Sequence, residues 1–308
     1  NTRSRGLGDV YKRQGVDSDL MMVAFGYHGA NFHGSQIQPD VRTVQGEIKG
    51  AIEKLGWWSE SCLEMSSRTD SGVSVRMNLA TILLPKKIAK IIDEASLVSA
   101  LNDHLPEDLV VWRACRVPEG TRSRIAEKRL YVYRCDMIPG WPTELEFDEL
   151  KSACNLFVGQ HDFTNFCRLD SNRSPIRIIE SCKPLQDDAG RVVGFTVVAD
   201  SFLWNQIRRM ASALHKFVKK DIRLDDITLA LDNPNEPFDL GLAPANGLIL
   251  WSLGHPEFSH KFENLEIIEG ISMPPEGKRA HRQWLNLARM ENSSILEREW
   301  LRLIRDVN

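Results

Sequence analysis

The residue types best suited to chemistry occur together in the segment SRTDSGV, residues 67–73. Asp70 supplies a carboxylate and Arg68 a guanidinium, in a glycine-containing loop that is predicted between a helix and a strand. Loops of this kind place side chains into clefts, where a carboxylate can attack carbon. The same residues also fit an Asx-turn, in which Asp70 only accepts hydrogen bonds from nearby backbone N–H groups. The rest of the sequence has to distinguish these two interpretations.

Basic side chains gather in two segments, although the chain carries 39 basic and 42 acidic residues and a formal charge of −3. Net charge therefore gives no general indication of a nucleic-acid partner. If both segments line one groove they form a track for phosphate groups, whereas ordinary solvated surfaces would give the same pattern. Arg129, Arg209 and Lys216 are the candidates for such contacts with a phosphate backbone. The segments contain Arg122, Arg124, Lys128, Arg129 and Arg134, then Arg208, Arg209, Lys216, Lys219, Lys220 and Arg223.

Composition and cysteine spacing exclude several classes of protein. Hydrophobic residues make up 42% and charged residues 26% of the 308 residues, which is typical of a globular protein and not of a disordered one. No apolar run approaches the ~20 residues that span a bilayer, so we expect a soluble, cytoplasmic protein. The six cysteines are never closer than 13 residues, which excludes CxxC zinc sites and favours reduced thiols. His28 and His33 lack a carboxylate or thiol at ligand spacing, so we expect no metal site there.

The elements that must position Asp70 form a compact α+β unit. An apolar segment at 21–27 predicts a strand, and apolar residues at helical spacing after Thr43 predict a helix. The loop with Asp70 follows, and then a strand at 79–84, a helix around 94–103 and an extended segment at 109–116.

After a linker at 117–121, the pattern of strands and helices repeats. We expect strands at 130–138, 176–185, 191–200 and 248–252, a helix from Phe147 that is stopped by Gly159, and a long helix over 203–220. The fold class is therefore α+β, with two pseudo-duplicated subdomains whose largely antiparallel sheets face a central basic cleft. The expected domains are 21–117, which carries the Asp70 loop, and 118–255.

The two ends of the chain differ from this pattern. Residues 1–20 show no periodicity and precede the first methionines, Met21 and Met22, so we interpret them as a disordered leader that is not native. Residues 256–308 are expected to form a mostly helical extension of unknown role, with one helix or two around 284–287 and 296–304.

Motifs elsewhere in the sequence indicate a function for the Asp70 loop. RTDSGV resembles the RTDAGV motif of the tRNA pseudouridine synthase A (TruA) family, and seven further family motifs follow the same order along residues 21–255. Three positions depart from the family pattern: Ser35, Ser74 and Asn78. Serine and asparagine at the last two are similar to archaeal-type members. The remaining matches are Tyr27-His28-Gly29 with Phe32, Gly34, Gln36, Gln38 and Pro39; Thr43-Val44-Gln45; Leu101-Asn102 with Leu105-Pro106; Arg129-Leu130-Tyr131-Val132-Tyr133; Gly159-Gln160-His161-Asp162-Phe163 with Phe166; Phe202-Leu203 with Ile207-Arg208; and Ala243-Pro244 with Gly247-Leu248.

The resemblance implies a role for each of four residues. Asp70 would be the nucleophile, Arg208 its ion-pair partner, and Tyr131 the ring that stacks on the flipped uracil, while Arg68 would contact the substrate. Without the resemblance, Arg208 would fit a solvated stripe of its helix, and Tyr131 would be an ordinary core residue. Whether Asp70 attacks the ribose, attacks the base or removes a proton is left open by the sequence.

The resemblance also implies the reaction and the partners. Uridine and pseudouridine are isomers, so the conversion loses no atoms, changes no oxidation state and requires neither a metal nor an organic cofactor. The implied substrate is uridine at positions 38 to 40 of the anticodon stem-loop of tRNA, and the implied assembly is a homodimer. A non-catalytic RNA-binding paralogue and a pseudouridine synthase acting on other RNAs remain the alternatives.

Overall fold

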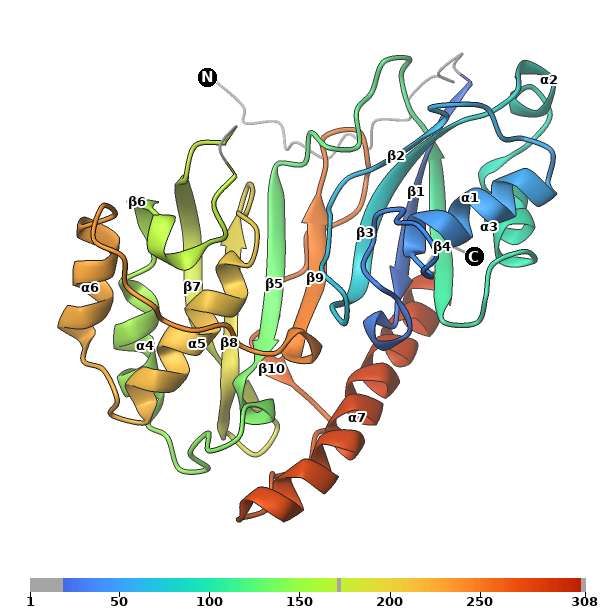
Figure 1. Cartoon of the computed structure of the whole chain (residues 1–308). Coiled ribbons are helices and arrows are strands. Elements are labelled where there is room, and N and C mark those ends of the chain that lie inside the picture. The colour runs from blue at the N-terminus through green and yellow to red at the C-terminus, as the bar shows by residue number, and fades with distance from the viewer. Residues whose placement is uncertain (1–18, 171–172, 306–308) are drawn as a thin grey trace, which may run out of the picture.

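The computed structural model describes residues 19–170 and 173–305, so most of the expected leader lies outside the described residues. A single mixed sheet forms its centre, in the order β10-β7-β8-β5-β9-β3-β1-β4, with β2 beside β3 and β6 beside β7 (Figure 1). The strands are β1 (Leu20–Tyr27), β2 (Leu63–Met65), β3 (Ser74–Leu83), β4 (Leu109–Arg116), β5 (Lys128–Arg134), β6 (Gly159–Asp162), β7 (Ile176–Asp187), β8 (Val192–Ala199), β9 (Leu248–Gly254) and β10 (Ile267–Ile268).

The expected α+β class with largely antiparallel strands is confirmed, since only β3·β9 and β7·β10 pair in parallel among the described strands. The strands of the two halves do not form separate sheets. They join where β3 runs beside β9, through the pairs Ser74–Ile249 and Val75–Leu250. The helices are α1 (Val44–Lys54), α2 (Lys86–Ala89), α3 (Glu94–Asn102), α4 (Phe147–Asn155), α5 (Gln206–Val218), α6 (Leu224–Asp232) and α7 (Lys278–Arg305).

Local sequence explains where these elements begin and end. Thr43 caps α1, because its side chain accepts a hydrogen bond from the Gly46 N–H at 3.3 Å, and helix formation starts at the next residue as predicted. The strand expected at 130–138 is shorter, because β5 ends at Arg134 and the chain turns through a 3-10 helix at Cys135–Met137. Of the one or two helices expected around 284–287 and 296–304, the structure has a single continuous helix, α7.

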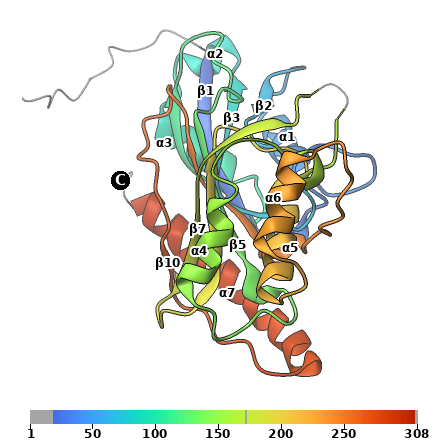
Figure 2. The same cartoon turned by 90° about the vertical axis from the view of Figure 1, so that its left-hand side faces the viewer.

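The two faces of the sheet bury different side chains. Tyr131 and Tyr133 of β5 point into the core that is covered by α1, α3, α4, α5 and α6. Leu130 and Val132 point to the opposite face, where the C-terminal half of α7 packs. Figure 1 shows α4, α5 and α6 in front of one part of the sheet, α1 and α3 in front of the other, and α7 running obliquely beside it. Figure 2 shows the sheet from its side.

The C-terminal extension is an integral layer of the fold. Trp300 of α7 is 2% exposed and donates to the Arg76 carbonyl at 3.0 Å. A side chain at Gly26 would collide with the Trp300 ring, since a Cβ there would lie 2.2 Å from Nε1. His28 Nε2 lies 2.7 Å from Glu297 of α7, so this histidine serves the attachment of the helix. In the described part of the chain, each helix is either too short or too polar to span a lipid bilayer.

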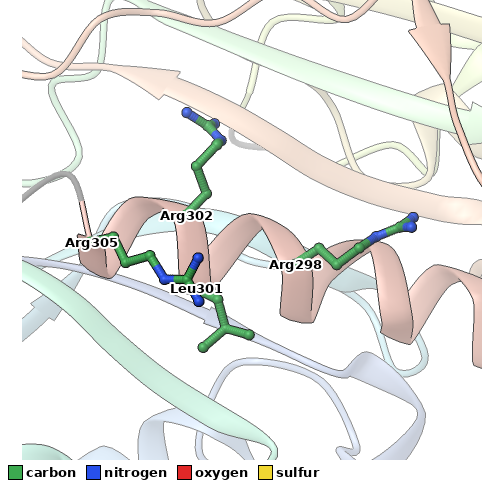
Figure 3. A pocket seen from close by; sticks show the side chains of 4 residues that line it. All are labelled: Arg298, Leu301, Arg302 and Arg305. Carbon is green, nitrogen blue, oxygen red and sulfur yellow. The ribbon is translucent and has the colours of Figure 1, made fainter.

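Ion pairs to the buried Arg76 connect α7 and the segment before it to strand β3. The fully buried Arg76 donates to Glu299 at 2.7 Å and to Glu263 at 2.8 Å. Arg302 also contacts both carboxylates, at 2.7 and 2.8 Å. A pocket of about 320 Å³ lies beside Arg302 on the same helix and is lined by Arg298, Leu301, Arg302 and Arg305 (Figure 3). The carboxylates of Glu263 and Glu299 each contact both Arg76 and Arg302, so two acidic groups balance two guanidinium groups at the C-terminal part of α7.

Acid should weaken this attachment. His260 at 3.5 Å and the Arg76 and Arg302 guanidinium groups hold the pKa of Glu263 at about 2, against burial, which raises it. Because the pKa of Glu263 is lower in the folded protein than its ordinary value of 4.5, the ionised carboxylate stabilises the fold fully above about pH 4.5. This stabilisation is lost as the pH falls toward 2. Glu263→Gln should lower the free energy of unfolding by about 1–3 kcal/mol at pH 7 and flatten its decline between about pH 4.5 and 2. Thermal melts across that range check this, and identical pH profiles for both proteins would contradict it.

Candidate active site

The Asp70 loop is held by hydrogen bonds from the segment between β1 and α1. Ser35 Oγ accepts from the Thr69 N–H at 2.9 Å, and the Ser35 N–H donates to the Thr69 carbonyl at 3.1 Å. The Tyr27 hydroxyl lies 2.7 Å from Thr69 Oγ1. Gly34 adopts a φ of +93°, and a side chain there would press on the Thr69 carbonyl at 3.2 Å. The residue before Asp70 is therefore fixed through both its backbone and its side chain.

The three residues that depart from the family pattern all form hydrogen bonds with backbone groups in or near the Asp70 loop. Ser35 makes the bonds to Thr69, Ser74 Oγ accepts from the Gly29 N–H at 3.0 Å, and Asn78 exchanges two bonds with the backbone of Ser67, at 2.9 and 3.1 Å. Each departing side chain is thus a hydrogen-bonding partner of the chain near the loop. None of them contacts the Asp70 carboxylate in the described residues.

Asp70 and Arg208, which are 138 residues apart, are in contact. Arg208 is in the first turn of α5, and its Nη1 donates to Asp70 Oδ2 at 3.1 Å. Its Nε donates to the Ala243 carbonyl at 2.8 Å, which fixes the guanidinium plane. The Arg208 side chain is only 16% exposed and that of Asp70 is 30% exposed, so the pair is partly withdrawn from water. The contact spans the junction of the two halves, because Asp70 precedes β3 and α5 belongs to the other half.

Trp204 was not predicted from the sequence as a site residue, yet it is the second partner of the carboxylate. Its Nε1 donates to Asp70 Oδ1 at 3.0 Å. The sequence does contain one indication of its role: Trp204 is an aromatic residue that lies between Leu203 and Ile207, two residues that match a family motif, and close to Arg208. Within the described residues, each oxygen of the Asp70 carboxylate therefore has one donor.

Tyr131 lies in the core next to this pair. It is 7% exposed, and its ring meets Phe202 edge to face with centroids 5.3 Å apart. Burial raises the pKa of the Tyr131 hydroxyl to about 12, opposed by Arg129 and reinforced by the Asp70 carboxylate. The hydroxyl is therefore neutral at pH 7, so this ring is suited to packing and not to removing protons.

Arg68 lies near other charged side chains at the Asp70 loop. Arg68 is exposed, yet its pKa is lowered. Partial desolvation is the main cause, and repulsion from Arg124 and Arg173 adds to it. Arg168 lies on the same segment as Arg173, and its guanidinium stands 4.0 Å from the centroid of the Trp204 ring. Arg208 contacts Asp70 and Arg168 contacts Trp204, so guanidinium groups from two segments lie at the candidate nucleophile. Arg124 and Arg173 are instead paired with acidic residues, Glu64 at 3.5 Å and Asp170 at 3.6 Å.

The other basic candidates occupy different environments. Arg129 is 8% exposed and donates to Ser67 Oγ at 2.9 Å and to the Asp200 carbonyl, so its guanidinium is bound within the protein. Arg209 lies 3.9 Å from the Asp239 carboxylate, and Lys216 Nζ donates to the Asp239 carbonyl at 3.1 Å. The structure thus brings together Asp70, Arg208 and Tyr131, with Arg68 beside them. It places Arg129 beneath the loop and Arg209 and Lys216 along α5.

Comparison with known proteins identifies the class. Residues 153–256 match the family model described as tRNA pseudouridine synthase, a class of isomerases. Over 240 residues, the chain is 35% identical to tRNA pseudouridine synthase A of Methanocorpusculum labreanum, covering 76% of this chain and 79% of that one. It is 31% identical to the Thermococcus sibiricus protein of the same name over 283 residues, covering 89% and 96%. The Limosilactobacillus fermentum protein of that name is 32% identical, covering 74% and 93%.

These similarities extend over most of the chain and most of each relative. The chain belongs to the tRNA pseudouridine synthase A family. The expected resemblance, including its archaeal members, is confirmed.

Proposed function

We propose that this protein isomerises uridine to pseudouridine in the anticodon stem-loop of tRNA, at positions 38 to 40, with Asp70 as the nucleophile. In this reaction the N1–C1′ bond of the nucleotide breaks, the uracil turns, and a C5–C1′ bond forms while the proton on C5 is lost and N1 gains one. A carboxylate that forms a covalent intermediate divides this change into two easier steps. The resemblance further implies a cytoplasmic homodimer, and light scattering of the purified protein tests the assembly.

One observation carries this proposal: the Asp70 carboxylate is held by Arg208 and Trp204 at the edge of a buried aromatic core. Desolvation disfavours an ionised carboxylate, and a charge-assisted bond from a guanidinium offsets this effect. The two donors also orient the oxygens. Such an arrangement suits a carboxylate that must remain charged and point in one direction.

The cations around the loop suit an RNA substrate. Extruding a base from a structured RNA costs a few kcal/mol, which stacking and phosphate contacts must supply. Tyr131 offers a ring beside Asp70, and the exposed Arg68 offers positive charge two residues before it. Because these contacts would be with phosphates, binding should weaken steeply as salt rises.

The direct test measures tritium release from tRNA transcripts that carry uridine labelled at C5. Wild-type protein should release tritium, since the C5–H bond must break as the new glycosidic bond forms. Mapping of the modified positions then tests the choice of nucleotide. Tight binding without release would indicate an RNA-binding paralogue, and modification confined to other RNAs would indicate a different substrate.

Replacement of Tyr131 should separate its ring from its hydroxyl. Tyr131→Phe keeps the ring and should retain kcat/KM within about threefold, because a hydroxyl that stays protonated at pH 7 cannot act as a base. Tyr131→Leu removes an aromatic stack of ~1–3 kcal/mol and should lower kcat/KM by about 10- to 100-fold. Steady-state kinetics of tritium release measure both variants. An equal loss in Tyr131→Phe would contradict the stacking role.

A further inference from the structure

Trp204 has no role in the family resemblance, and its indole binds the oxygen of Asp70 that Arg208 leaves free. Trp204 Nε1 donates to Oδ1 at 3.0 Å, while Arg208 Nη1 donates to Oδ2 at 3.1 Å. Both donors come from the segment 202–208, which also supplies Phe202 against Tyr131. One short stretch of chain therefore controls the carboxylate and the neighbouring ring.

The backbone explains how two donors so close in sequence reach different oxygens. Asn205 adopts the left-handed conformation, with φ 64° and ψ 5°, directly before α5 begins. Asparagine accepts this conformation more readily than most residues with a side chain. Its Oδ1 also accepts from Arg208 Nη1 at 3.3 Å. The resulting turn brings Trp204 and Arg208 to Asp70 separately.

Burial does not fix the indole, because Trp204 is 49% exposed. Arg168 fixes it instead. The Arg168 guanidinium lies 4.0 Å from the ring centroid, and the Arg168 N–H donates to the Trp204 carbonyl at 2.8 Å. A cation over an indole face is the strongest form of the cation–π contact among the aromatic side chains. Arg168 thus holds both the ring and the backbone of the tryptophan.

We propose that Trp204 is a positioning residue that fixes the rotation of the Asp70 carboxylate, and that Arg168 keeps its indole in place. The terminal torsion of an aspartate is soft, so a carboxylate with a donor on one oxygen can rotate, whereas donors on both oxygens restrain it. The indole N–H is neutral, so it adds this restraint without a second full charge on the nucleophile. The inference rests on the proposed function of Asp70.

The test replaces Trp204 with phenylalanine, which keeps an aromatic ring for Arg168 and removes the N–H. The kcat of tritium release should fall by about 10- to 100-fold, because orientation acts on the chemical step. The KM and the Kd for an unlabelled tRNA transcript should stay within about twofold of wild type. Trp58→Phe is the matched control, since Lys49 covers the Trp58 ring at 5.0 Å in a similar way, and its kinetics should be unchanged.

Variants of Arg168 provide a second, independent measurement. Arg168→Lys keeps a cation on the indole and should retain most of kcat, whereas Arg168→Gln should reproduce the loss seen in Trp204→Phe. A raised KM or Kd with unchanged kcat in Trp204→Phe would show that the indole serves RNA binding, and unchanged kinetics would show that it serves neither; both overturn the proposal. Wild-type protein without tritium release would instead refute the proposed function, a result distinguishable from either.

Discussion

Asp70→Asn is expected to abolish tritium release, with a loss of at least about 10⁴-fold in kcat. The amide has almost the shape of the carboxylate but carries no charge and is a poor nucleophile. This expectation holds whether Asp70 attacks the ribose, attacks the base or removes a proton, because each role needs the anion. Single-turnover measurements with excess protein set the limit on the residual rate.

The fold should survive this substitution. The new side chain can still accept from Arg208 or Trp204 through its amide oxygen, and Arg208 keeps its bond to the Ala243 carbonyl at 2.8 Å. We expect the melting temperature to change by less than about 4 °C. Asp148→Asn, at a side chain that is 91% exposed, is the matched control and should retain full activity. A collapse of the melting temperature in Asp70→Asn would mean that the residue is structural.

Arg208→Lys should have the second largest effect, a loss of about 100-fold in kcat. Lysine keeps the positive charge but replaces a planar group with a point donor, so it cannot bond Asp70 and the Ala243 carbonyl in the same geometry. The side chain is 16% exposed, and water therefore cannot easily take the place of the missing bonds. Arg289→Lys, at an exposed position of α7, is the control and should stay near wild type. Equal kinetics for the two variants would contradict the pairing.

Regular periodicity made much of the fold predictable from the sequence. The extended segment expected at 109–116 has the bounds of β4, and the helix expected after Thr43 begins at Val44. The strands β2 and β6 were not predicted, because three or four residues are too few to display a period of two. The helix α6 was also missed, although Asp226 accepts from the Arg223 N–H at 2.8 Å in a recognisable helix start.

The site was predictable only in part, and for a different reason. Asp70, Arg208 and Tyr131 were assigned from motifs in their order along the chain, since no local pattern relates residues 138 positions apart. Trp204 depends on the left-handed turn at Asn205 and on Arg168, which approaches from another segment. Arg129 was considered as a surface cation because its burial depends on how β5 packs against the Asp70 loop. Tertiary packing determines these features.

The parallel pairing of β3 with β9 has a consequence for how activity arises during folding. The candidate nucleophile is attached to β3 and its two donors to the chain leading into α5, so neither half of the sequence alone contains a working centre. Contacts between residues so distant along the chain form late, because closing long loops is slow. Helix content should therefore recover before catalysis does when the denatured protein is diluted into buffer. Isomerase activity would then report completion of the native topology and would not accompany collapse of either half alone.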